Sequence, residues 1–408
     1  LLPNGTFVNE MQYFKISNDA VAGRPIFQFN NLTSGFNYEL ASLYRAHELN
    51  LPVKYVELGN EFYFNDEHYK EVFPSSYDYI NYANAFTDAL KSKVPFADVQ
   101  VAVVGSSFSE NSAGRRSLWL ETILSNIHNV THRPDAITIH EYYTSGLSNP
   151  IDFGPYNIGQ MFIKPFIKGD DLIANELQAV EDRSSALGLN PPLEVWLTEY
   201  NMNDDVSNNV GTWAHGLFNA IQTLKYLESP LITHLSSHAM TSDAVYGNIF
   251  ESNRGFQNLA EGQLPENVKL VGAGNFETTP YGFTASGAAQ NEIALAMKGT
   301  GVEAHRIDFS PNSTAIGNIS YFDANGNYVT SSNLLNLYGW SFEKEEGFEA
   351  IILNLGQAFY SIGNPSDLTS INSITNVPQS MVQLTTIDPT TGLGSVVKLP
   401  VANQLNNN

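Results

Sequence analysis

Short apolar segments alternate with amphipathic segments over residues 1–298. Apolar residues that recur at helical spacing predict helices over 8–17, 38–49, 77–93, 117–127, 172–187, 212–227 and 281–298. Runs rich in β-branched and aromatic residues predict strands over 25–30, 53–60, 99–105, 136–142, 193–198 and 231–236. The stretch 143–169, rich in Gly, Pro and Asn, is predicted to be a loop. Strands and helices that alternate in this way form a parallel sheet, and their spacing is typical of a (β/α)8 TIM barrel.

The pattern changes after residue 298. Strand-like segments are separated by turn signals such as Ala324-Asn325-Gly326, and they cover 316–322, 334–342, 350–355, 381–387 and 395–399. A series of short strands with turns between them is typical of a β-sandwich. We therefore expect a catalytic barrel over 1–298 and a β-sandwich domain over 299–408.

Composition excludes several classes of protein. Lys and Arg number 20 against 42 Asp and Glu, a net charge of −22, so a basic face for nucleic acid is not expected. The sequence has no apolar run near the roughly 20 residues of a membrane span. It also has no cysteine, which excludes disulfides and thiolate ligands. The acidic, Asn-rich composition favours a secreted, periplasmic or cell-surface protein.

Candidate chemistry lies just past the ends of two predicted strands. Glu61 closes the motif VELGNE (56–61), and Glu199 lies in WLTEYN (196–201). The carboxyl ends of parallel barrel strands open onto one face, so the two carboxylates can meet there. Retaining glycoside hydrolysis needs such a pair about 5–5.5 Å apart, one as the acid and the other as the nucleophile. His128 and His132 lack the glutamate of the zinc-protease motif, and neither a metal nor a cofactor is expected.

In this order the motifs resemble those of glycoside hydrolases of clan A, in the branch with an appended β-sandwich (families 51, 39, 30 and 79). Asn60-Glu61 is similar to the acid/base motif that ends the clan's fourth strand. Glu199 is similar to the nucleophile that ends the seventh, and His140-Glu141-Tyr142 to the His-x-Tyr of the sixth. The resemblance implies a retaining hydrolase of an extracellular polysaccharide or oligosaccharide, with Glu61 as acid/base and Glu199 as nucleophile.

The resemblance also implies contacts with the sugar. Asn60 would bond its 2-hydroxyl, His140 would line the subsite, and Tyr142 would hold the nucleophile carboxylate. Further candidate substrate contacts are Asn30, at the end of an earlier strand, Tyr63 and Tyr200. The run 62–64 is equally suited to stacking on sugar and to packing a loop. Arabinofuranosides or β-xylosides are the first expected substrates, with glucuronides and algal galactans behind them.

Other readings stay open at this point. Glu57 and Glu61 are an even number of positions apart, so along a strand their side chains would point the same way. If Glu57 is buried it needs a partner, which favours a structural ion pair over catalysis. Arg115-Arg116 is expected to be a solvated pair, with a site for acidic sugars as the alternative. The whole protein could instead be a non-catalytic carbohydrate-binding protein, an inverting hydrolase or a transglycosylase on the same fold.

The clan's acid/base has three strands before its own, but only 60 residues precede Glu61. We therefore expect a separate N-terminal segment or a second chain to supply the first two barrel strands, as the resemblance to family 79 heparanase-like enzymes suggests. Glu57 is expected to pair with a group from that segment or, failing that, with a His or Tyr.

Overall fold

The computed structural model describes most of the predicted barrel region and many of the strands after it. The described residues are 11, 14, 15, 18, 19, 25–107, 114–127, 132–143, 158–203, 210, 213–240, 246–251, 268–270, 276–278, 281–298, 302–307, 318–322, 328–335, 337–344, 347–354, 382–387 and 394–399. The helix predicted over 8–17 lies largely outside them. The chain divides into two compact units, of which unit 1 holds 1–141, 171–198 and 231–235, and unit 2 holds 142–170, 199–230 and 236–408.

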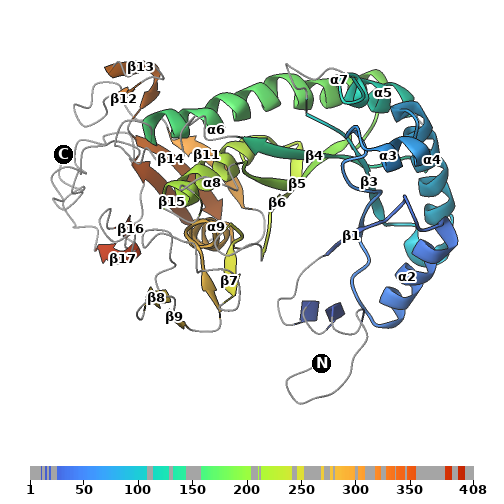
Figure 1. The fold of residues 1–408 in the computed structure, drawn as a ribbon, viewed down its shortest axis with the longest axis horizontal. Coiled ribbons are helices and arrows are strands. Elements are labelled where there is room, and N and C mark those ends of the chain that lie inside the picture. The colour runs from blue at the N-terminus through green and yellow to red at the C-terminus, as the bar shows by residue number, and fades with distance from the viewer. Residues whose placement is uncertain are drawn as a thin grey trace. The chain divides into compact units, whose positions relative to one another are not determined.

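The six predicted barrel strands are present and form one sheet in sequential order (Figure 1). They are β1 (Ile26–Gln28), β2 (Tyr55–Glu57), β3 (Gln100–Val104), β4 (Ala136–Tyr143), β5 (Glu194–Met202) and β6 (Ile232–Ser237). The first four pair in parallel, with Val56 beside both Phe27 and Val101. This arrangement is consistent with part of a TIM barrel. The strands expected from an N-terminal segment stay a prediction.

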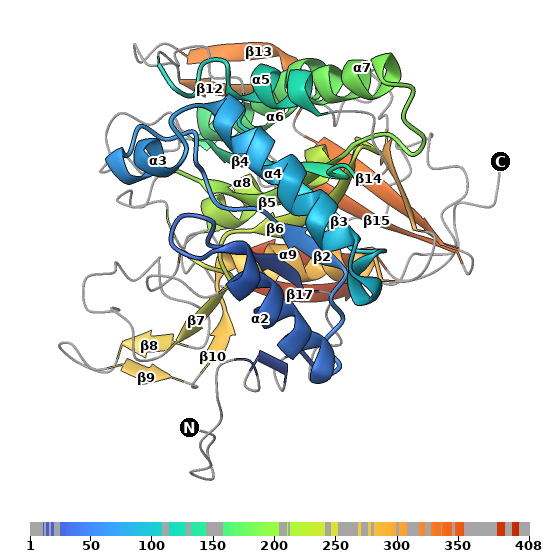
Figure 2. The ribbon, with the colours of Figure 1, turned by 90° about the vertical axis from the view of Figure 1, so that its right-hand side faces the viewer.

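Helices connect the strands of unit 1 and lie outside them (Figure 2). They are α2 (Phe36–Glu48), α3 (Glu67–Val72), α4 (Ser76–Lys91), the 3-10 turn Val94–Phe96, α5 (Trp119–Asn126) and α7 (Gln178–Ala186). The start of α4 is fixed by a capping box. Ser75 Oγ accepts from the Asp78 backbone N–H at 3.3 Å, and the Asp78 carboxylate accepts from the Ser75 N–H at 3.0 Å.

Two aromatic side chains tie the helices of unit 1 to the ends of its strands. The Tyr79 hydroxyl donates to the Leu58 carbonyl at 2.8 Å and accepts from the Val104 N–H at 2.7 Å. Trp119 Nε1 donates to the Val104 carbonyl at 2.9 Å. Because Tyr79 and Trp119 are fully buried, these bonds form in a dry core, where polar groups need partners. The segment that follows β2, which carries Glu61, therefore starts from a fixed point.

Unit 2 contains a helix where the sequence predicted a loop. Helix α6 (Ile158–Leu172) continues through the π-helical turn Ile173–Leu177 into α7, so the loop predicted over 143–169 is wrong from residue 158 onward. The Gly, Pro and Asn content of this stretch indicated a loop, but the helix continues through Pro165. Phe162 and Phe166, one turn apart, are buried, and the Phe166 ring lies 4.2 Å from that of Tyr338. Packing of this apolar face offsets the hydrogen bond that proline removes.

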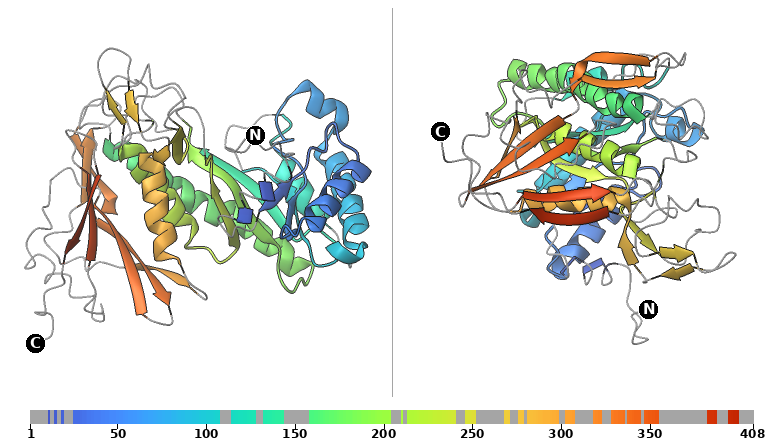
Figure 3. Two further views of the ribbon diagram at one scale, coloured as in Figure 1. Left: turned by 90° about the horizontal axis from the view of Figure 1, so that it is seen from below. Right: turned by 90° about the vertical axis from the view of Figure 1, so that its left-hand side faces the viewer.

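Two further helices of unit 2, α8 (Trp213–Tyr226) and α9 (Ala285–Ala296), lie side by side, and α9 contacts a strand of the later β structure (Figure 3). The later strands are β7 (Ile249–Glu251), β8 (Val268–Leu270), β9 (Phe276–Thr278), β10 (Tyr281–Phe283), β11 (Glu303–Ile307), β12 (Asn318–Phe322), β13 (Tyr328–Leu335), β14 (Leu337–Lys344), β15 (Gly347–Asn354), β16 (Val382–Ile387) and β17 (Gly394–Leu399). Strands β11, β14 and β15 form an antiparallel sheet. The β-sandwich and its boundary after 298 stay predictions. Among the described residues, no helix is both long and apolar enough to cross a bilayer.

Candidate active site

Glu61 lies in a tight turn directly after β2. Gly59 and Glu61 both have positive φ angles, 116° and 51°. A residue other than glycine is uncommon in this left-handed region, and such residues cluster at functional sites. A Cβ on Gly59 would come within 2.1 Å of the Phe62 ring, so both the backbone angle and the available space require glycine there. The turn is thus built to hold Glu61 in one orientation.

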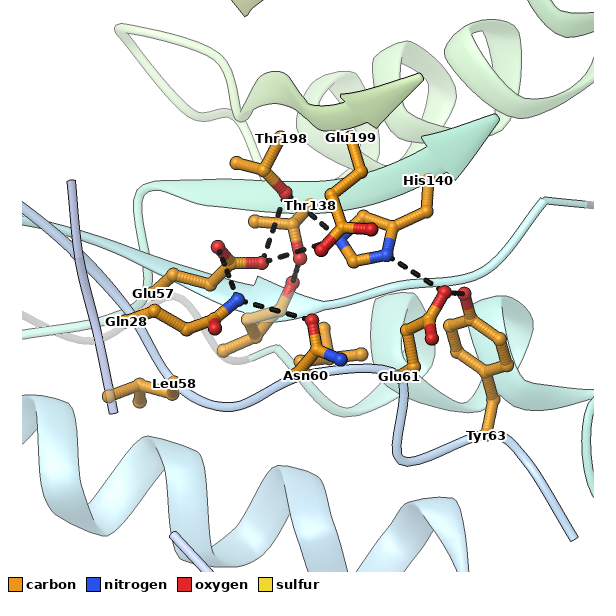
Figure 4. Close-up of polar contacts among 12 residues, drawn as sticks. Gln28, Glu57, Leu58, Asn60, Glu61, Tyr63, Thr138, His140, Thr198 and Glu199 are labelled. Atoms are coloured by element: carbon orange, nitrogen blue, oxygen red, sulfur yellow. Dashed lines mark hydrogen bonds and ion pairs between the residues drawn. The ribbon is translucent and has the colours of Figure 1, made fainter. Parts of the chain in front are cut away.

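Two hydrogen-bonding groups face the Glu61 carboxylate (Figure 4). Its Oε1 atom lies 3.0 Å from His140 Nδ1 and accepts from the Tyr63 hydroxyl at 3.0 Å. Partial burial raises the pKa of Glu61. The hydrogen bond and charge of His140, with Tyr63 and the positive charge of Arg116, outweigh that effect and lower the pKa below its usual value. The ligand-free site therefore favours the ionised form of Glu61.

On the other side of His140 lies a second carboxylate. His140 Nε2 is 3.1 Å from Thr198 Oγ1 and 3.9 Å from Glu57 Oε1, and the Thr198 hydroxyl donates to the same Glu57 oxygen at 3.1 Å. Glu57 is only 2% exposed. Of the partners expected for a buried Glu57, the described chain supplies a histidine, joined through a threonine that sequence reasoning did not single out. A partner from an N-terminal segment stays a prediction.

The protonation of Glu57 reflects its burial. Loss of solvent raises the pKa of Glu57, although the charge of His140 and hydrogen bonds from Thr138, Thr198 and Gln28 act against this. Gln28 Nε2 lies 3.3 Å from Glu57 Oε2 and also donates to Asn60 Oδ1 at 3.2 Å. Four side chains thus point at one buried carboxylate, which is an arrangement that limits its freedom to move.

The candidate amide residues lie in different places. The structure brings Asn60 into the Glu57 cluster through Gln28. Asn30 lies in a turn beyond β1, where its Oδ1 accepts from the backbone N–H groups of Leu32 and Thr33 at 3.2 and 3.3 Å. Its Nδ2 donates to Thr33 Oγ1 at 2.8 Å. The side chain of Asn30 therefore stabilises the turn in which it lies, and its role as a sugar contact stays a prediction.

The aromatic run 62–64 divides between packing and exposure. Phe62 and Tyr63 are each 2% exposed, whereas Phe64 is 42% exposed. The Arg116 guanidinium lies 4.7 Å from the Tyr63 ring centroid and donates to Ser107 at 2.6 Å. Arg115 Nε donates to the Phe62 carbonyl at 2.7 Å. The prediction of a solvated arginine pair is therefore wrong, because both guanidinium groups pack against this run.

In unit 2, Glu199 lies on β5 and its carboxylate accepts a hydrogen bond from Tyr142. The Tyr142 hydroxyl is 2.7 Å from Glu199 Oε2, a short bond of the kind that a charged acceptor forms. The ring of Tyr142 also meets that of His238 edge to face, with centroids 5.8 Å apart. The contact expected between these two residues is thus present.

Tyr200, the next residue of β5, is buried in unit 2 and is 1% exposed. Its hydroxyl lies 2.7 Å from Thr223 Oγ1 and donates to Gln290 at 3.2 Å. Burial raises the pKa of Tyr200. These contacts join β5 to α8 and α9, so the role of Tyr200 as a substrate contact stays a prediction without support from its position.

A buried polar network follows Glu199 along the chain and was missed by sequence reasoning. Asn201 Oδ1 accepts from Asn219 Nδ2 at 2.8 Å and lies 2.7 Å from His215 Nε2, and its Nδ2 donates to the His238 carbonyl. Burial lowers the pKa of His215 to about 3, so this imidazole is neutral. The signal was present in WAHGLFNA (213–220), which places His215 and Asn219 on one face of a helix.

The sequence matches no described protein family and no curated protein. Among solved structures, the chain is similar to a family 51 α-L-arabinofuranosidase from Bifidobacterium longum, with a TM-score of 0.63 and 11% identity over 95% of this chain and 74% of that one. A 4-O-α-L-rhamnosyl-β-D-glucuronidase from Fusarium oxysporum is more distant, with a TM-score of 0.46 and 11% identity over 81% of this chain and 60% of that one. At 11% identity, the similarity to the arabinofuranosidase shows a shared fold and no more. The similarity to the glucuronidase is too low to support a conclusion.

Proposed function

We propose that this protein is a retaining glycoside hydrolase in which Glu61 is the acid/base and Glu199 is the nucleophile. The single observation that supports the proposal is that each carboxylate is hydrogen-bonded by neighbouring side chains near the end of a strand, and that the two strands belong to one sheet. Glu61 follows β2 and bonds His140 and Tyr63, and Glu199 bonds Tyr142 near the end of β5. Enzymes of the barrel fold carry their catalytic groups at these ends.

The reaction proceeds in two displacements. Glu199 attacks the anomeric carbon while Glu61 gives its proton to the leaving oxygen, which forms a glycosyl ester on Glu199. Glu61, now ionised, takes a proton from water, and that water breaks the ester with net retention of configuration. The low pKa of Glu61 in the ligand-free site suits the second step. For the first step Glu61 must carry the proton, and a bound sugar that excludes water from the half-buried carboxylate raises its pKa in that direction.

The neighbouring groups fit supporting roles. Tyr142 orients the Glu199 carboxylate by its hydrogen bond. Gln28 holds the Asn60 carbonyl oxygen, which turns the amide nitrogen of Asn60 toward a sugar hydroxyl. His140 lines the subsite beside Glu61.

For the substrate, we propose a neutral sugar of an extracellular polysaccharide or oligosaccharide, and a secreted protein. α-L-arabinofuranosides come first, because the protein from Bifidobacterium longum that shares the fold is an arabinofuranosidase. β-Xylosides come second. A panel of chromogenic glycosides followed by polysaccharides identifies the sugar, and the direct test is retention of configuration at its anomeric carbon.

Azide rescue tests the assignment of the two carboxylates. Glu61→Ala should lose most activity on glycosides with poor leaving groups, and azide should restore turnover of activated ones as a glycosyl azide of retained configuration. Glu199→Gln should have no turnover that azide restores in this way, because an amide cannot form the ester. Glu194→Gln, on the same strand, is the matched control and should keep its activity. Sugar binding without turnover in the wild type would instead favour a non-catalytic carbohydrate-binding protein.

A further inference from the structure

A chain of hydrogen bonds within unit 1 runs from buried Glu57 to Glu61. It passes from Glu57 Oε1 to Thr198 Oγ1 (3.1 Å), to His140 Nε2 (3.1 Å), and from His140 Nδ1 to Glu61 Oε1 (3.0 Å). The two carboxylates lie on opposite sides of one imidazole (Figure 4). Glu57 is not needed for either displacement of the proposed reaction, yet its side chain is 3% exposed and accepts bonds from Thr198 and Gln28.

The direction of these bonds fixes where protons sit. The Thr198 hydroxyl donates its hydrogen to Glu57 Oε1. Although burial raises the pKa of Glu57, this bond, those from Thr138 and Gln28 and the charge of His140 favour its ionised form. Thr198 Oγ1 must then accept from His140, which places a proton on Nε2. The other ring nitrogen, Nδ1, faces Glu61. That bond holds one proton, either on Nδ1 beside an ionised Glu61 or on Glu61 beside a neutral imidazole.

We propose that Glu57 is a positioning residue with two effects on His140. Through Thr198 it keeps the imidazole protonated on Nε2. By its negative charge it holds the one proton of the hydrogen bond between His140 Nδ1 and Glu61 in that bond. The inference rests on the proposed function of Glu61 as acid/base. When that proton is on Glu61, the acid can pass it to the leaving oxygen, and His140 stays neutral with its Nε2 proton in place. In the second displacement the proton taken from water returns to the same pair, so the proton count balances over one turnover.

Other charged and titratable groups also act on this pair. Arg116, Tyr63 and Tyr69 interact with Glu61, and Glu141 interacts with Tyr63. Glu199 follows Thr198 in the chain. Each of them is unchanged in a variant of residue 57, so a comparison with the wild type isolates the contribution of Glu57.

The test is a titration of His140 by long-range ¹H–¹⁵N NMR of the ¹⁵N-histidine-labelled chain, with the signal assigned from a His140→Asn variant. In the wild type, His140 should keep its Nε2 proton above the titration midpoint. In Glu57→Gln the midpoint should fall by about 1 to 3 pH units, the usual effect of losing an opposite charge at this distance. An unchanged midpoint would overturn the proposal.

Further variants separate this role from general damage to the fold. Thr198→Val should allow the Nδ1–H tautomer, and Thr198→Ser should restore the wild-type tautomer. If Glu57→Gln does not fold, the two Thr198 variants provide the test. The same His140 tautomer in Thr198→Val and Thr198→Ser would contradict the hydrogen-bond chain from Glu57 to His140. The matched control is Glu39→Gln, which removes another carboxylate whose pKa is raised by burial and should leave His140 unchanged.

The spectra do not depend on turnover. If His140 responds as described but the wild type hydrolyses no glycoside, the proposed function is contradicted, whereas the proposed effect of Glu57 on His140 is supported. If the wild type is active, the alkaline limb of its kcat/KM profile should move to lower pH in Glu57→Gln by the amount seen in the spectra. If the titration midpoint of His140 shifts but the alkaline limb of the kcat/KM profile does not, a role of Glu57 in catalysis through His140 would be contradicted.

Discussion

Each proposed catalytic carboxylate depends on one or two neighbouring side chains. Glu61 contacts His140 and Tyr63, and Glu199 contacts Tyr142. Hydrogen bonds to charged acceptors are stronger than neutral ones, so the loss of a single donor has a measurable effect on a carboxylate that takes part in the reaction.

Tyr142→Phe removes the donor to Glu199 and leaves the ring in place. A hydrogen bond to a charged group contributes about 1.5–3 kcal/mol, which corresponds to a fall in kcat/KM of roughly ten- to a hundredfold. Steady-state kinetics on an activated glycoside measures the effect. Tyr143→Phe, the adjacent tyrosine of β4, is the control and should change kcat/KM little. Equal activity of Tyr142→Phe and the wild type would argue against Glu199 as the nucleophile.

At the scale of elements, the turn after β2 determines where Glu61 points. Gly59→Ala places a methyl group against Phe62 and forces a left-handed angle on alanine. We expect a loss of unfolding free energy of at least about 1 kcal/mol, from the backbone angle alone, with a fall in activity. Gly188→Ala also has a positive φ, 63°, but nothing lies within 4 Å of its added Cβ. Urea denaturation should therefore show the larger loss at Gly59, and equal losses would show that the Phe62 contact is unimportant.

The buried network between β5 and α8 predicts a dependence of stability on pH. His215 has a pKa of about 3 in the folded protein against an ordinary value of 6.5. Below pH 6.5 the unfolded chain binds the proton and the folded protein does not, so stability falls as the pH drops from about 6.5 to 3. The slope is roughly 1.4 kcal/mol for each pH unit. In His215→Asn this part of the slope should disappear, and an unaltered slope in denaturation curves would contradict a neutral, buried His215.

The elements that depend on local pattern could be predicted from the sequence. The run VAVV (101–104) is apolar throughout and buried, a pattern typical of a parallel strand, so β3 could be predicted. The helix at 158–172 was missed because its stability comes from contacts of Phe162 and Phe166 that local composition does not reveal. The bond between Thr198 and Glu57 joins residues 141 positions apart, and no spacing rule in the sequence points to it.

At the scale of the whole molecule, the chain does not divide where its sequence texture changes. Trp340 of β14 donates to Glu228, beyond the end of α8, at 3.0 Å, and Arg306 of β11 lies 3.4 Å from the same carboxylate. Glu228 also pairs with buried Lys225 at 2.6 Å. The strands after residue 298 thus share one compact unit with α8. A sequence boundary marks a change in composition, whereas these contacts depend on side chains far apart in the chain.

The central claim is that Glu199 forms a covalent bond with the sugar. The most direct measurement is mass spectrometry of the protein after incubation with an activated 2-deoxy-2-fluoro glycoside of the sugar that the panel identifies, followed by proteolysis. We predict one label per chain on the peptide that contains Glu199, with none on Glu199→Gln and full labelling of Glu194→Gln. A protein that hydrolyses the parent glycoside but carries the label on another residue, or gives a product of inverted configuration, would contradict the account.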